Sequence, residues 1–189
     1  MADIRKAQKD DYVNIARILL PVFSDKAEAI LGDAGQAEMI LPMMVDAFKG
    51  LNLIASENNR PVGAIIVTTE ELKLPSKTFK IVRNEVGFFG ALRAIRIVKN
   101  YEKSLPQRLE GEVRLEAVGV TVEARNRGIG TQLIRRAEEW SVKNDMKHFG
   151  LSVKTDNPAV RLYKRLGFSR VTSFTNRLGR WSYMRKTFG

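Results

Sequence analysis

Two glycines between basic residues mark the part of the sequence best suited to bind a phosphate. The segment from Arg125 to Thr131 reads RNRGIGT, and Gly128 and Gly130 stand where a strand must turn into a helix. The first turn of a helix leaves backbone N–H groups unpaired and carries about half a positive charge. Glycine removes the Cβ atoms that would keep a ligand away from those amides. A diphosphate is the natural ligand of such a corner, and Arg125 and Arg127 add charge at its rim.

A simpler explanation of this corner stays open, since a strand-to-helix turn can use glycine only for its backbone freedom. The other glycine-rich phosphate motifs are excluded. A phosphate-binding P-loop requires GxxxxGK[ST], which the sequence lacks. The dinucleotide motif GxGxxG requires a third glycine where Leu133 stands, and no acidic ribose partner follows a second strand.

The segments on both sides of the corner have clear periodicities. In the segment from Leu115 to Ala124, valines at 118, 120 and 122 alternate with smaller residues, which predicts a strand. After Gly130, apolar residues recur at steps of three and four and charged residues fill the other side, which predicts an amphipathic helix. The residues of the apolar side are Leu133, Ile134, Ala137, Trp140 and Ser141.

This strand, turn and helix resemble the coenzyme A pyrophosphate loop of the GNAT superfamily of acyl-CoA-dependent N-acyltransferases. The shared motif is Arg125-x-x-Gly128-x-Gly130 after LEAVGV. A second motif follows at the family's distance, in LSVKTDNPAVRLYKRLGF. It consists of a strand, an Asn, a short helix with a Tyr four residues before a Gly, and an aromatic residue; here these are Asn157, Tyr163, Gly167 and Phe168. The resemblance covers about residues 113–175 and departs at Val122, where many members have proline.

The resemblance implies an α/β (α+β) fold with a mixed, mostly antiparallel central sheet flanked by helices. It also implies that acetyl-CoA is the co-substrate and that the acetyl group passes directly to a primary amine in a ternary complex. The acceptor is a small-molecule amine, or the N-terminus or a lysine of a protein. The residues that it assigns to the coenzyme are Val118, Gly119, Val120, Arg125, Asn126, Arg127, Gly128, Ile129, Gly130, Thr131 and Asn157. Asn157 can also be no more than a helix cap.

Transfer to an amine needs a base, because lysine-type amines titrate near 10.4 and are mostly charged at neutral pH. The candidate base is Glu116, and some family members have a catalytic glutamate at this position. By strand alternation we expect Glu116 to share a face with Val118 and Val120. The candidate acid is Tyr163, whose hydroxyl the resemblance places near the sulfur of the departing thiolate. The structural alternatives are a solvated or salt-bridged Glu116 and a Tyr163 packed between helix and sheet.

Three further polar residues need an interpretation. Glu112 and Arg114 are expected on the same face as Glu116, so Glu112 is a reserve base and Arg114 a partner for an acidic group of the substrate. His148 has no acidic or hydroxyl partner at a useful spacing, and we interpret it as structural. No set of His, Asp and Glu has the spacing of metal ligands, so no metal is predicted.

The composition is that of a globular protein with a strong positive charge. The 189 residues carry a formal net charge of +11, which attracts polyanions such as coenzyme A, nucleic acid or anionic membrane. We expect one domain over residues 1–189. The absence of cysteine excludes disulfides and an acyl-cysteine intermediate. The start lacks an apolar signal core and no apolar run has membrane-spanning length, so we expect a cytoplasmic protein without an integral membrane segment.

The rest of the chain predicts elements in the order of the GNAT family. The expected strands are Asp3–Ala7, Leu51–Ser56, Val62–Thr68, His148–Lys154, Ser169–Thr175 and Trp181–Thr187, and the expected helices are Tyr12–Phe23, Gln36–Phe48 and Pro158–Leu166.

An insertion of about residues 70–112 separates the third and fourth strands. Within it, Asn84–Lys103 predicts an extra basic amphipathic helix, which can be a lid, a membrane-surface helix, a dimer element or a packed accessory helix. Its expected apolar side is Val86, Phe89, Leu92, Ile95, Ile97 and Val98.

Two other function classes compete with the acyltransferase. A non-catalytic acyl-CoA sensor would keep the coenzyme site, but retention of both Glu116 and Tyr163 argues against it. A nucleic-acid-binding protein would interleave aromatic and basic residues. The sequence shows little of this pattern outside Phe88, Phe89 and Tyr101, so nucleic acid is an unlikely partner. A homodimer stays open.

Overall fold

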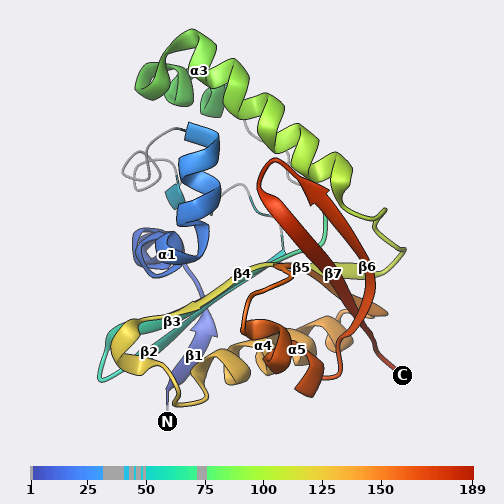
Figure 1. Cartoon of the computed structure of the whole chain (residues 1–189). Coiled ribbons are helices and arrows are strands. Elements are labelled where there is room, and N and C mark those ends of the chain that lie inside the picture. The colour runs from blue at the N-terminus through green and yellow to red at the C-terminus, as the bar shows by residue number, and fades with distance from the viewer. Residues whose placement is uncertain (1, 32–40, 43–44, 46–47, 49, 72–75) are drawn as a thin grey trace.

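Seven strands form one sheet in the order β1-β2-β3-β4-β5-β7-β6 (Figure 1). The computed structural model describes residues 2–31, 41–42, 45, 48, 50–71 and 76–189. Neighbouring strands run antiparallel, except that β4 and β5 are parallel. This confirms the predicted mixed, mostly antiparallel sheet. The strands are β1 (Asp3–Lys6), β2 (Gly50–Glu57), β3 (Arg60–Thr68), β4 (Glu112–Val120), β5 (His148–Lys154), β6 (Ser169–Asn176) and β7 (Gly179–Thr187).

Helices cover both faces of the sheet (Figure 1). On one face lies α1 (Tyr12–Leu31), whose buried side includes Ile15 and Leu19. On the other face lie α4 (Ile129–Lys143) and α5 (Ala159–Arg165), which pack on a second apolar cluster. Because each face carries its own core, β4 is covered on both sides. The predicted helix Gln36–Phe48 falls largely outside the described residues, and α1 extends beyond the predicted end at Phe23.

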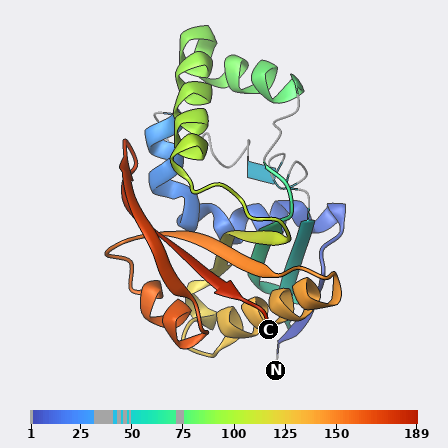
Figure 2. The same ribbon diagram turned by 90° about the vertical axis from the view of Figure 1, so that its right-hand side faces the viewer.

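The insertion between β3 and β4 contains α3 (Ser76–Ser104), which Gly87 breaks into two pieces of different direction (Figure 2). Gly87 has φ 73° and ψ 173°, a left-handed backbone conformation that favours glycine. The first piece packs Val82 against Ala91 and Ala94 of the second. This contact sets the buried side of α3, so the expected apolar side is wrong at Phe89 and Leu92, which are 84% and 46% exposed.

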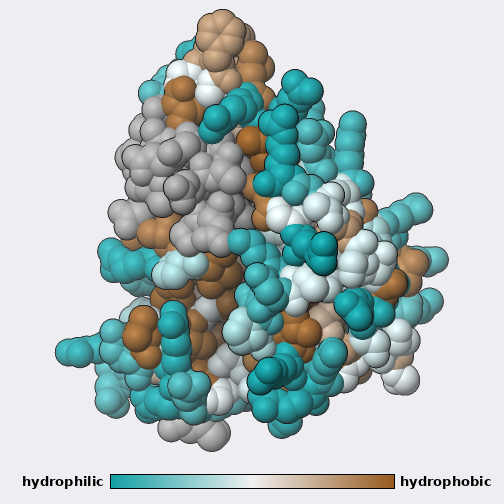
Figure 3. Space-filling view, in the orientation of Figure 1, coloured by the Kyte–Doolittle hydropathy of each residue, from teal (hydrophilic) through white to brown (hydrophobic). Residues whose placement is uncertain are grey.

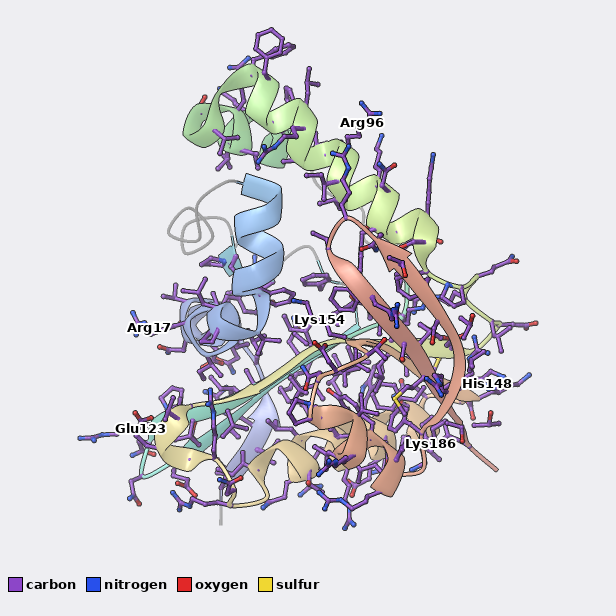
Figure 4. All side chains as sticks on the ribbon, in the orientation of Figure 1. Arg17, Arg96, Glu123, His148, Lys154 and Lys186 are labelled. Atoms are coloured by element: carbon purple, nitrogen blue, oxygen red, sulfur yellow. The ribbon has the colours of Figure 1, made fainter. Side chains whose placement is uncertain are left out.

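Exposed apolar residues of α3 gather at the end of the molecule farthest from α4 (Figure 3). They are Phe88, Phe89 and Leu92, next to the break at Gly87. Arg96 on α3 and Arg17 on α1 point away from the interior (Figure 4). Among the described helices, none combines the length and the apolar character that crossing a bilayer requires.

The close approach of α1 to β4 depends on a residue without a side chain. A Cβ built on Gly119 would lie 3.0 Å from Leu19 Cδ2 and 3.1 Å from the carbonyl oxygen of Ile18. These separations are tighter than ordinary packing, and the carbonyl belongs to the backbone of α1. Glycine at this position therefore lets the helix lie directly on the strand.

We expect Gly119→Val to lower the free energy of unfolding by about 1–3 kcal/mol, because the added side chain overpacks the α1–β4 contact. Urea unfolding followed by circular dichroism measures the change. The matched control is Thr172→Val, which introduces the same side chain at an exposed position of β6. A Gly119→Val protein as stable as the control would contradict the packing argument.

Candidate active site

The centre of the sheet opens because β4 and β5 pair over only part of their length. The parallel ladder joins Glu112–Leu115 to His148–Leu151 and then stops. Beyond it, β4 stays paired with β3, and β5 stays paired with β7. The edge of β4 from Glu116 to Val120 that faces β5 therefore has no strand partner in the described part of the chain. Its backbone groups are available to an extended ligand, as in strand addition.

A β-bulge interrupts β4 at Glu116. The register with β3 steps from Ile66 opposite Ala117 to Val67 opposite Leu115, so Glu116 is an extra residue without a partner across the ladder. Its Oε1 accepts a hydrogen bond of 2.8 Å from the Thr68 hydroxyl. Thr68 shares its face of β3 with Ile66, which packs in the α1 cluster.

The bulge corrects the expected orientation of Glu116. Val118 and Val120 pack against the opposite cluster, which contains α4 and α5. The prediction that Glu116 shares their face is therefore wrong, because strict alternation fails where one strand carries an extra residue. Glu116 instead directs its carboxylate to the α1 side of the sheet, across the strand from the α4 helix.

Arg108, which the sequence did not single out, binds the ends of β3 and β4 together. Its Nη1 donates to the carbonyl oxygens of Thr68 (3.0 Å) and Glu112 (3.1 Å). Its Nη2 donates to the Thr68 hydroxyl oxygen (3.2 Å) and the Glu70 carbonyl (3.1 Å). Burial lowers the pKa of Arg108, and the positive charge of Arg114 lowers it further. Only the fold brings Arg108 to Glu116.

Glu102, a residue of the insertion, carries a carboxylate close enough to Glu116 for their charges to interact. Partial desolvation raises the pKa of Glu102, and the negative charges of Glu71 and Glu116 raise it further. Like charges disfavour ionisation of their neighbours. Glu116 therefore lies within electrostatic range of both the Glu102 carboxylate and the Arg108 guanidinium, so charges of both signs meet on this side of β4.

The last turn of α3 attaches the insertion to the edge of the opening (Figure 2). The Tyr101 hydroxyl lies 2.6 Å from Ser152 Oγ, one residue beyond the end of the β4–β5 ladder. The Tyr101 ring also meets the Trp181 ring edge to face, with centroids 5.5 Å apart. Asn176 Nδ2 donates to Ser104 Oγ at 3.0 Å. The insertion thus reaches the same opening as Glu116.

The glycine corner follows β4 as the sequence predicts, with one change. The strand ends at Val120, and Val122–Ala124 forms a 3₁₀ turn, η2, where the strand was expected to continue. Gly128 is the N-cap of α4 with φ 78°, a conformation that favours glycine.

The first turn of α4 is not capped by a side chain, so its backbone N–H groups remain available. A Cβ on Gly130 would lie 3.7 Å from Val120 Cγ2, which is ordinary contact, so the fold itself does not require glycine there. Arg125 Nε lies 3.5 Å from the Val120 carbonyl. Arg127 pairs with Glu57, at 2.8 Å between Nη1 and Oε2, which reduces its contribution to the positive rim.

Tyr163 lies on α5 with only 8% of its surface exposed. Burial raises the pKa of its hydroxyl to about 12, so the group keeps its proton at neutral pH. The ring meets Phe168 edge to face, with centroids 6.0 Å apart. Asn157 Oδ1 accepts the N–H of Ala159 at 2.8 Å, which is the capping interaction that the sequence left open.

Glu112 belongs to the fold and is not a reserve base. Its side chain is fully buried, and it accepts hydrogen bonds from the Tyr183 hydroxyl, the Leu109 N–H (2.9 Å) and Arg185 Nη2 (3.0 Å). Burial alone would raise the pKa of Glu112, but these donors and the two arginines outweigh it and lower the pKa. Arg114 Nε lies 3.6 Å from Glu112 Oε1. Arg114 is therefore not free to bind an acidic substrate.

A glycine makes room for this buried group. A Cβ on Gly150 of β5 would overlap the Tyr183 hydroxyl and the Glu112 carboxylate. Burial also raises the pKa of Tyr183, as does its hydrogen bond to Glu112, so the phenol remains the donor.

Neither His148 nor any described acidic cluster forms a metal centre. His148 and Lys154 mark the two ends of β5 (Figure 4), and His148 Nδ1 lies 3.1 Å from Thr187 Oγ1 on β7. This contact fits the structural interpretation. Among the described residues, no group of three His, Asp or Glu side chains is arranged to hold a metal ion.

The parted strands, the free edge of β4 and the uncapped glycine corner are features that suit an extended ligand with a phosphate end. The chain belongs to the acetyltransferase (GNAT) family, whose sequence profile matches residues 16–168. It is thus a member of a family of acyl-CoA-dependent acyltransferases, as the two sequence motifs predicted.

Similar proteins and structures are named acetyltransferases. An uncharacterized N-acetyltransferase, YobR, from Bacillus subtilis (strain 168) is 36% identical over 73 residues, which are 38% of this chain and 30% of that protein. An N-acetyltransferase structure from Staphylococcus aureus Mu50 aligns with TM-score 0.68 and 21% identity over 97% of this chain and 100% of that one. A GNAT acetyltransferase from Brucella melitensis, solved with acetyl-CoA, aligns with TM-score 0.57 and 17% identity over 100% and 89%. Both structural likenesses show the same fold.

The buried carboxylate of Glu112 predicts a pH-dependent stability. Because its pKa is lowered in the folded state, its contribution is present above the ordinary glutamate pKa of about 4.3 and is lost as pH falls through the folded value. We expect Glu112→Gln to cost about 3–5 kcal/mol at pH 7, since it removes the buried negative charge that offsets the cations of Arg114 and Arg185. Urea unfolding at pH 7, 5, 4 and 3 should show this difference shrinking toward low pH. A difference that stays constant would contradict the assignment.

Proposed function

We propose that this protein is an N-acetyltransferase that moves an acetyl group from acetyl-CoA to a primary amine by direct attack in a ternary complex. The observation that carries the proposal is the continuity of the free edge of β4 with the uncapped first turn of α4. An extended coenzyme can lie along Val118–Val120 with its diphosphate at the corner. Its thioester then reaches Glu116, the residue just beyond the β4–β5 ladder.

The coenzyme is held by backbone groups more than by side chains. The amides of Ile129, Gly130 and Thr131 point to the diphosphate, because the first turn of a helix has no intrahelical acceptor for them. Gly128 supports the left-handed turn, and Asn126 also has positive φ, at 61°. Arg125 adds charge beside the phosphates, whereas Arg127 does so only in competition with Glu57. The amide group of Asn157 donates to the pantetheine arm while its oxygen caps α5.

Glu116 acts as the general base and Tyr163 as the general acid. Glu116 first takes one proton from the ammonium, directly or through water, and the freed nitrogen lone pair then attacks the thioester carbonyl carbon. When the C–S bond breaks, the Tyr163 hydroxyl gives its proton to the thiolate, and the second proton that the amide nitrogen loses restores the hydroxyl. No described residue accepts a hydrogen bond from this hydroxyl, so its proton is available to a ligand.

The acceptor is a primary amine of a small molecule, or the N-terminus or a lysine of a protein. Such an amine arrives as a cation at neutral pH. The carboxylates of Glu71, Glu102 and Glu116 attract this charge to the α1 side of β4. The protein's net charge of +11 favours the anionic coenzyme at the other end of the ternary complex.

We expect Gly130→Glu to weaken acetyl-CoA binding by roughly 100-fold, or about 2.7 kcal/mol, because a carboxylate then faces the diphosphate. Isothermal titration calorimetry measures the affinity. The control is Thr172→Glu, which makes the same change of charge on exposed β6. Equal affinities for the two variants would place the diphosphate elsewhere.

We expect Glu116→Gln to lower kcat by roughly 100-fold and Tyr163→Phe by at least about 10-fold, since each removes a proton-transfer group. Acetyl-CoA affinity should stay within about a few-fold in both variants. Thiol release from acetyl-CoA, measured with a panel of diamines, arylalkylamines and short peptides, gives kcat. The absence of turnover with every amine, together with intact acetyl-CoA binding, would favour the non-catalytic acyl-CoA module.

A further inference from the structure

We propose that Thr68 and Arg108 are positioning residues for Glu116: together they fix one oxygen of its carboxylate and leave the other for the acceptor amine. This inference rests on the proposed role of Glu116 as base. It adds to that role two residues from separate segments, the end of β3 and the connection after α3.

Arg108, Thr68 and Glu116 are connected by two hydrogen bonds in series, and the donor of each bond follows from the chemistry of the groups. The Arg108 guanidinium can only donate, so the Thr68 hydroxyl oxygen must accept from its Nη2 at 3.2 Å. An ionised Glu116 can only accept, so Thr68 must donate its one hydroxyl hydrogen to Oε1 at 2.8 Å. The chain therefore runs from Arg108 to Thr68 to Glu116 without an alternative orientation.

The positive charge of Arg108 makes the Thr68 hydroxyl a better hydrogen-bond donor to Glu116. A hydrogen bond from a cation polarises the hydroxyl, and hydrogen bonds in series strengthen one another at low local dielectric. Thr68 is 1% exposed, so water does not compete for its hydroxyl. Arg108 is itself fixed by the carbonyls of Thr68, Glu70 and Glu112.

The intervening hydroxyl keeps the base usable. A direct bidentate contact between Arg108 and Glu116 would occupy both carboxylate oxygens and oppose proton uptake. With Thr68 between them, the described residues engage Oε1, and none of them bonds to Oε2. The bulge at Glu116 is what brings the carboxylate onto the Thr68 face.

The test compares Thr68→Val with Thr68→Ser. Valine has the shape of threonine without the hydroxyl, whereas serine keeps the hydroxyl. We expect Thr68→Val to lower kcat by roughly 10-fold while KM for acetyl-CoA stays within about two-fold, and Thr68→Ser to regain most of the turnover. In a Glu116→Gln background, Thr68→Val should cause no further loss, because both changes act through the same carboxylate. Thermal unfolding verifies that each variant is folded, and Thr68→Ala, which also lacks a donor, replaces the valine variant if that protein does not fold.

Crystal structures of the two variants give a readout that needs no acceptor. The Glu116 carboxylate should leave its present position in Thr68→Val and keep it in Thr68→Ser. An unmoved carboxylate in Thr68→Val, a wild-type kcat of that variant, or an additive loss in the Glu116→Gln background would each overturn the positioning role and leave the base intact. A fully active Glu116→Gln protein would instead show that Glu116 is not the base, and the positioning role of Thr68 and Arg108 would then be refuted as well.

Discussion

The structure depends on the point at which β4 and β5 part. Each strand is already satisfied on its outer side, β4 by β3 and β5 by β7, so separating them costs backbone pairing only along their inner edges. Unpaired backbone groups in a protein interior need partners. The free backbone groups of β4 can therefore pair with an extended ligand. The positive N-terminus of α4, which follows β4, attracts a negatively charged end of that ligand.

Glu112 and Glu116, four residues apart on β4, have different environments because they lie on opposite sides of the point where β4 and β5 part. Glu112 lies within the ladder, where Tyr183, Arg185 and a backbone amide surround it. Glu116 lies just beyond the ladder, on a bulge, and within the described part of the chain its carboxylate is bonded by Thr68 alone. The same side chain is a buried anchor in one place and an accessible carboxylate in the other.

Local patterns were sufficient for the corner and for the elements around it, because each depends on a few consecutive residues. The helix after Gly128 follows directly from periodicity, whereas the strand before it follows only as far as Val120. The bulge could not be predicted, since an extra residue in β4 is defined only against its neighbour β3. Arg108 reaches Thr68 from 40 positions away, and no spacing signals that contact. The buried side of α3 was misjudged at Phe89 because its two halves pack on each other across Gly87.

Gly150 limits which substitutions the buried group around Glu112 can accept during evolution or protein engineering. Because Gly150 has no side chain, the phenol of Tyr183 and the carboxylate of Glu112 can meet directly over its Cα. A side chain at position 150 would displace the phenol, and Glu112 would then keep only its backbone and arginine donors. We therefore expect substitutions at these three positions to be tolerated best when they occur together.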